Sequence, residues 1–271
     1  MGHLYKNEIR KLVAKKSSWI LMIIALVFEA LVMIVQHATD KSLTTGKLVM
    51  GGGPQIGGTF VLIFSIVVTA IIVTEEFQRN TVKLLLTRPY TRSQVLGSKF
   101  LAAFSYMLSS YVAVYVFGIL LSLILGGGFN DITETVSAVN ATPLMYAILG
   151  LESQLFVNIF YLLVTFLLAA GMRSQALSIT FSIGLYFLLQ NIGTMFSLYI
   201  AFTKMYWLKW NPMTLIMVSQ DSILNIGLTK IASFSGLNTP LWAAMLALLA
   251  YMIVIYYFAD LIFKKRDISL S

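Results

Sequence analysis

A run of glycines between residues 51 and 58 is the first feature that could carry chemistry. It reads Gly51-Gly52-Gly53-Pro54-Gln55-Ile56-Gly57-Gly58, and glycine-rich loops can cradle phosphate groups with their backbone amides. That use requires a closing Gly-Lys-Ser/Thr after a strand, and the chain contains no such sequence. We therefore predict a flexible external turn within a loop over residues 37–58, and no Walker-type ATP site in this chain.

An acidic pair and an arginine form a second candidate. Glu75, Glu76 and Arg79 resemble the Glu-Glu-x-x-x-Arg motif of one family of intramembrane proteases, but the spacing is one residue short. That chemistry also needs buried histidines, whereas His3 lies near the N-terminus and His37 lies in a predicted loop. Two separated histidines without cysteine are also a poor ligand set for a metal. We expect neither catalytic residues nor a metal site.

Polar side chains inside otherwise apolar stretches form the third set. Such groups are costly in a bilayer and often line a transport pathway. Alternatively, the amides among them hold helices together by hydrogen bonds. The candidate substrate-pathway residues are Glu29, Glu152, Asn158, Gln190 and Asn191.

The composition predicts which kind of element positions these residues. Hydrophobic residues make up 58% of the chain and charged residues 11%, whereas about 25% are charged in soluble proteins. The chain is therefore expected to cross the membrane several times. Its net charge of +8 then reflects basic cytoplasmic loops, and no nucleic-acid partner is expected. The absence of cysteine excludes a disulfide framework.

Six apolar stretches are long enough to cross a bilayer. The first is longer than the apolar part of a cleaved signal peptide, which has about 7–15 residues, so it is interpreted as a retained span. The predicted fold is all-α, with residues 1–271 forming a single transmembrane domain of six helices. The predicted spans cover residues 19–35, 59–74, 100–125, 144–171, 176–202 and 241–263.

Residues 203–240 do not fit a span. Two short apolar runs, 213–218 and 223–228, are separated by a polar stretch, and neither reaches the ~20 residues needed to cross. We predict short external or re-entrant helices here, with Trp207, Trp210 and Trp242 at headgroup depth. The alternative is a polar seventh span, which would place the basic C-terminus outside.

The distribution of basic residues predicts the orientation. Fourteen of the 19 Lys and Arg residues lie in segments 1–18, 75–99, 173 and 264–266, and five lie in the intervening loops. Because Lys and Arg accumulate in cytoplasmic loops, both termini are predicted to be cytoplasmic.

The N-terminal segment 1–18 is basic and weakly amphipathic. Tyr5, Ile9, Leu12 and Val13 fall near helical spacing, which favours an interfacial helix on the cytoplasmic surface. A solvated basic leader that only sets topology is the alternative.

The charged loop 75–99 contains two helix starts. Asn80 can cap a helix from Thr81 whose apolar face carries Val82, Leu85 and Leu86. Arg88 precedes Pro89, which ends this helix. Thr91-Arg92-Ser93-Gln94 then reads as a capping box for the helix that enters the third span. An amphipathic helix of this kind can dock in a groove of a partner or lie among lipid headgroups.

This loop resembles that of type-two ABC (ATP-binding cassette) transporter permeases. The similar features are the acid pair, Thr-Val-Lys-Leu-Leu-Leu-Thr, Arg-Pro, Thr-Arg-Ser-Gln-Val-Leu and Lys99. The six-span layout, the amphipathic N-terminus and the interrupted segment before the last span also match. One departure is Asn80, where many members have Gly.

The resemblance implies a role for this loop. It implies that residues 81–88 are a coupling helix seated in a separate nucleotide-binding ATPase, present in two copies, which binds ATP and Mg. It also implies a second permease subunit, the same or homologous, in the cell membrane. This chain itself would hold no cofactor and would be non-catalytic. The implied coupling residues are Glu75, Glu76, Arg79, Thr81, Val82, Leu85, Leu86, Arg88 and Pro89.

Two other functions remain open from the residues alone. A channel or ATPase-independent secondary transporter would show internal repeats and several mid-membrane charges, and we find no convincing repeat. A membrane assembly protein without transport would not need the polar groups inside the spans. Abundant Phe, Met and Leu suit an amphipathic or lipophilic cargo, such as an antimicrobial peptide, drug or lipid, and the resemblance favours export.

Overall fold

The computed structural model describes residues 2–50, 53–78, 90–134, 142–172, 174–217 and 241–265. All regular structure in these residues is helical. The order is α1 Gly2–Ala14, α2 Lys16–Thr39, α3 Thr45–Met50, α4 Gly53–Gln78, α6 Arg92–Gly126, α7 Asn130–Thr133, α8 Pro143–Gly171, α9 Gln175–Thr203, η1 Tyr206–Trp210 and α11 Leu241–Lys265.

Six stretches of these residues are long and apolar enough to span a membrane, as predicted. They are Lys16–Thr39, Thr45–Glu75, Arg92–Gly126, Pro143–Gly171, Gln175–Ile200 and Trp242–Lys265. In the segment before the last span, η1 and a helical stretch over residues 212–217 are described. The rest of the predicted external or re-entrant region lies outside the described residues.

Local signals fix where several helices begin and end. The Thr91 hydroxyl accepts a hydrogen bond from the Gln94 amide, and the Gln94 side chain accepts one from the Thr91 amide, so the predicted capping box is confirmed. At the other end of α6, Gly127 has φ 81, the left-handed conformation that commonly ends a helix. The Thr142 and Ser174 hydroxyls also cap helix starts, accepting hydrogen bonds from the Met145 amide of α8 and the Leu177 amide of α9.

The predicted flexible turn before the second span is wrong. α3 occupies Thr45–Met50, and α4 begins at Gly53, so residues 53–58 of the glycine run are helical. Within this stretch Gly53, Gly57 and Gly58 face neighbouring helices. A Cβ atom added at Gly53 would lie 2.6 Å from the Met33 side chain of α2. Close helix packing in membranes uses small residues in this way.

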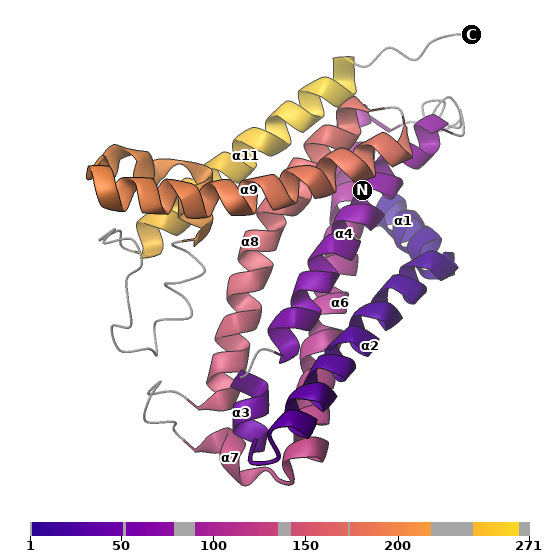
Figure 1. The fold of residues 1–271 in the computed structure, drawn as a ribbon. Coiled ribbons are helices and arrows are strands. Elements are labelled where there is room, and N and C mark those ends of the chain that lie inside the picture. The colour runs from indigo at the N-terminus through magenta and orange to yellow at the C-terminus, as the bar shows by residue number, and fades with distance from the viewer. Residues whose placement is uncertain are drawn as a thin grey trace.

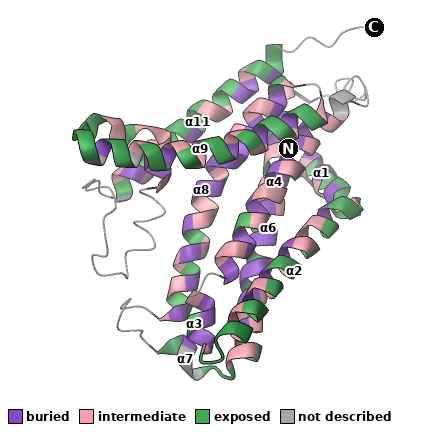
Figure 2. Cartoon of the chain, in the orientation of Figure 1, coloured by how far each residue is buried: buried purple, intermediate pink, exposed green. Residues whose placement is uncertain are grey.

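The core lies between α4, α6 and α8. One apolar cluster joins α2, α4, α6 and α8, and a second joins α4 and α8 to α9 and α11. Figure 1 shows α3 and α7 together at one end of the molecule and both termini toward the other. Figure 2 shows many exposed positions along α2, α9 and α11. These three helices therefore offer their apolar faces to lipid or to another subunit.

Candidate functional site at the basic end of the bundle

The N-terminal helix α1 packs against the bundle, as an amphipathic helix would. Leu4, Glu8 and Leu12 are buried because they are four residues apart and share one helix face. Val13, expected on that face, is 57% exposed. Tyr5 reaches Ser105 of α6, with their hydroxyl oxygens 2.8 Å apart.

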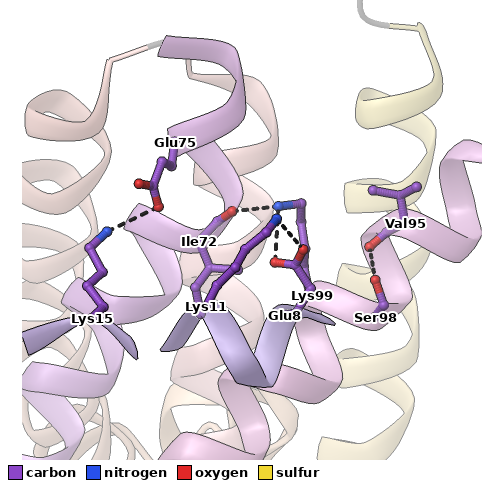
Figure 3. A network of polar contacts seen from close by, with 8 residues as sticks. All are labelled: Glu8, Lys11, Lys15, Ile72, Glu75, Val95, Ser98 and Lys99. Carbon is purple, nitrogen blue, oxygen red and sulfur yellow. Dashed lines mark hydrogen bonds and ion pairs between the residues drawn. The ribbon is translucent and has the colours of Figure 1, made fainter. Parts of the chain in front are cut away.

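Glu8 and Lys99 meet inside this contact. Lys99 Nζ lies 3.5 Å from Glu8 Oε2 and donates to the Ile72 carbonyl of α4 at 2.8 Å. Lys11 Nζ lies 2.6 Å from the other Glu8 oxygen, Oε1. Lys99 is only 1% exposed and Glu8 6%. One buried amino group thus joins α1, α4 and α6, as Figure 3 shows.

A second ion pair reinforces the first. Lys15 Nζ, between α1 and α2, donates to Glu75 Oε2 at 3.1 Å near the end of α4. Farther along the same end, Arg92 of α6 donates to the Lys264 carbonyl of α11 at 2.7 Å. The described parts of segments 1–18, 75–99 and 264–266, which are predicted to be cytoplasmic, therefore lie together at one end of the bundle. We call Glu8, Lys11, Lys15, Glu75 and Lys99 the basal network.

An apolar cluster at the same end of the bundle connects the helices of the basal network to α8 and α11. It brings together the ends of α4, α8 and α11 with the start of α6. Phe100 packs edge-on to Phe166 and Tyr256, with ring centroids 5.5 Å and 5.7 Å apart. The buried members are Val73, Leu96, Phe166, Ala169, Ala170, Ala259 and Phe263.

Two of the nine predicted coupling residues lie within the described part of the chain. Glu75 is paired with Lys15, and Glu76 lies in the last turn of α4. The other seven, Arg79, Thr81, Val82, Leu85, Leu86, Arg88 and Pro89, lie outside the described residues. Their segment joins α4 to α6, and both of those helices are tied to α1.

Sequence reasoning missed Glu8 and Lys99 as partners. Glu8 is the single acid in the basic segment 1–18, and Lys99 ends the charged loop 75–99. A signal was present, since Glu8 lies in phase with Leu4 and Leu12. A charged residue on the apolar face of a helix predicts a buried partner.

The predicted pathway residues lie in different environments. Glu29 and Asn158 are buried inside the bundle, at 0% and 4% exposure. Glu152 is exposed on α8 and Gln190 is half-buried on α9. Asn191 is exposed and donates to the Phe187 carbonyl of its own helix at 2.7 Å. The structure thus brings Glu29 and Asn158 into the bundle interior and leaves the other three outside it.

Asn158 belongs to a polar chain that crosses three helices. Its amide donates to the Tyr111 hydroxyl, which donates to the Gly58 carbonyl of α4 at 2.7 Å. One turn before Asn158 on α8, Gln154 donates to the Gln55 carbonyl at 3.4 Å. Tyr111 was not predicted as a site residue. Among the described residues, no group of three or more His, Cys, Asp or Glu side chains is arranged to hold a metal ion.

Comparison with known proteins assigns the chain to a family. A family model described as ABC-2 family transporter protein matches residues 4–191, well over half of the chain. The chain belongs to the ABC-2 transporter family. It is accordingly a multi-pass membrane protein of the permease type, and membership implies partnership with an ATPase subunit.

Two relatives of this ABC-2 chain come from Bacillus subtilis (strain 168). The uncharacterized protein YhcI is 27% identical over 214 residues, covering 76% of this chain and 64% of YhcI. The uncharacterized membrane protein YdbK is 25% identical over 262 residues, covering 95% of this chain and 99% of YdbK. The second match extends the similarity to nearly the full length of both proteins.

Proposed function

We propose that this chain is the membrane subunit of an ATP-driven exporter, energised by a separate ATPase that docks on residues 81–88. The family assignment supports the permease role. The sequence has no Gly-x-x-x-x-Gly-Lys-Ser/Thr, so the nucleotide and its Mg are assigned to the partner. The proposed cargo is an amphipathic or lipophilic molecule such as an antimicrobial peptide, a drug or a lipid.

The observation that carries the coupling proposal is the basal network. Segment 79–89 is covalently continuous with α4 and α6, and Lys99 ties both helices to α1. Pulling these buried charges apart is costly because each would lose its partner away from water. A push on the segment therefore moves α1, α4 and α6 together, and the apolar cluster passes the movement to α8 and α11.

A complete exporter is proposed to contain two ATPase copies and a second permease, the same or homologous. The exposed apolar side chains of α2, α9 and α11 are available to contact that second permease. Closure of the ATPase dimer on ATP would then push both coupling segments and change access to a pathway between the permeases.

Co-purification tests this proposal. The tagged chain is isolated from its own cells in mild detergent, and an ATP-binding subunit is expected to accompany it. Leu85→Glu places a charge on the predicted docking face and should weaken that association about tenfold or more. Lys47→Glu, an exposed change in α3 at the opposite end, should leave it unchanged.

Two outcomes would overturn the proposal. One is that no ATPase accompanies the unmodified chain and the purified chain moves solute alone, which would indicate a secondary transporter or channel. The other is that Leu85→Glu inserts into the membrane and retains full coupling, which would move docking away from residues 81–88.

A further inference from the structure

Glu29 is completely buried in α2 and meets no hydrogen-bond donor. Its exposed fraction is 0%, and neither of its carboxyl oxygens has a hydrogen-bond partner. It lies near the middle of a span that extends from Lys16 to Thr39. Buried polar groups are almost always hydrogen-bonded, so this carboxyl requires an explanation.

Two glycines on neighbouring helices make the space that it occupies. A Cβ atom added at Gly57 of α4 would lie 2.9 Å from Glu29 Oε2, and one added at Gly118 of α6 would overlap Oε1. The same added atoms would lie 2.6 Å from the Val114 side chain and 3.0 Å from that of Pro54. We call this space the carboxyl cradle. The carboxyl therefore packs directly against the backbones of two helices.

Among the residues that the structure describes, no cation is paired with Glu29 in the cradle. The titratable side chain that faces Glu29 from α6 is Tyr115, whose buried hydroxyl also has no hydrogen-bond partner. The sequence of α4 from Gly53 to Thr74 contains no charged residue. Lys99 of α6 and Glu8 and Lys11 of α1 belong to the basal network. Lys6 and Arg10 of α1 and Lys47 of α3 are exposed.

An isolated ionised carboxylate is very unfavourable in such surroundings. The cradle fits tightly around the carboxyl, and a proton is the one ligand that removes the charge without needing extra room. We propose that Glu29 is a proton-binding site, which holds a proton while α2, α4 and α6 are packed together and releases it when they separate. In the release step the carboxyl O–H bond breaks, its electron pair stays on the carboxylate, and the proton passes to water.

The site adds a function to the chain that does not depend on the ATPase. Any movement that opens the cradle lets water reach Glu29 and stabilises the ionised form. By linkage, proton binding favours the packed arrangement of the three helices and ionisation favours the separated one. A transport cycle that separates α2 from α4 and α6 therefore takes up and releases a proton at Glu29.

Infrared spectroscopy of the full chain in lipid vesicles tests the site directly. At neutral pH exposed carboxyl groups are ionised, so a carbonyl-stretch band of a protonated carboxylic acid identifies a buried neutral one. The band is expected in the unmodified chain and should be lost in Glu29→Gln, which keeps the shape and neutrality of the side chain. Glu152→Gln, at an exposed position of α8, should retain it.

A second pair of variants tests the cradle without replacing Glu29. Gly118→Ala adds a methyl group where Oε1 lies and should shift or abolish the band. Gly184→Ala, where an added Cβ has no atom within 4 Å, should leave it in place. If the unmodified chain shows only an ionised Glu29 at neutral pH, or if Gly118→Ala leaves the band unchanged, the proposal is overturned.

Discussion

Glu8 and Lys99 are the residues on which the basal network depends most. Their side chains are 7% and 2% exposed, so water screens their attraction very little. Burial of such a pair is not in itself strongly stabilising, but removing one partner leaves a buried charge behind. A single substitution in this pair is therefore expected to lower the stability of the folded protein substantially.

We predict that Glu8→Gln and Lys99→Met each lower stability by about 3–5 kcal/mol. The double variant should lose less than the sum of the two, with a coupling of about 0.5–3 kcal/mol. The measurement is unfolding of the four forms in one detergent. Lys264→Met is the matched control, because its ion pair with Asp260 has a lysine side chain that is 49% exposed and should contribute at most about 1 kcal/mol. If the stability lost by the double variant equalled the sum of the losses in the two single variants, the pairing of Glu8 with Lys99 would be contradicted.

At the scale of elements, the start of α6 is the first helical turn after the proposed coupling segment 79–89. The capping box fixes this start by satisfying amide groups that have no partner within the helix. Arg92, the first helical residue, also holds the end of α11. A well-defined first turn is needed if a push on the preceding segment is to move α6 as a rigid body.

Thr91→Ala should loosen this first turn. Loss of a capping hydroxyl costs about 1 kcal/mol, so amide hydrogen exchange over residues 92–95 should speed up about fivefold while the middle of α6 is unaffected. Thr39→Ala serves as the control, since the Thr39 hydroxyl bonds carbonyls of its own helix, Val35 and Gln36, and caps no helix start. Unchanged exchange in Thr91→Ala would show that tertiary contacts alone hold the turn.

The elements themselves could largely be predicted from the sequence. Long apolar runs and capping residues such as Thr91 determine where a helix lies in the sequence, independently of the helices that pack against it. The glycine run was misread because the same residues serve turns and close helix contacts. Only the positions of Met33 and Glu29 on α2 and of Val114 on α6 show that Gly53 and Gly57 are needed for packing. The pairing of Glu8 with Lys99 could not be predicted either, since it depends on how α1 docks across 91 positions of sequence.

At the scale of the whole molecule, the basic segments that predict orientation lie at one end. α1, the end of α4, the start of α6 and the end of α11 are joined there by the basal network and by Arg92. α3 and α7 lie at the opposite end. The positive-inside rule predicts that the basal network faces the cytoplasm, where an ATPase would be.

The absence of native cysteine makes this orientation easy to test. A single cysteine at Lys47 should react with a membrane-impermeant maleimide in intact cells. One at Lys264 should react only after the cells are permeabilised. The reverse pattern would place the basal network outside and would exclude docking of a cytoplasmic ATPase there.

The most direct test of the account is a cross-link from Leu85, in the same cysteine-free background. Leu85→Cys carries a short bifunctional cross-linker, and the products in native membranes are identified by mass spectrometry. We predict a product that joins this chain to an ATP-binding subunit, with no such product from Lys47→Cys. Labelling of position 85 only by a lipid-embedded probe, with no link to any ATPase, would contradict the account, because the leucine face would then lie in the membrane surface.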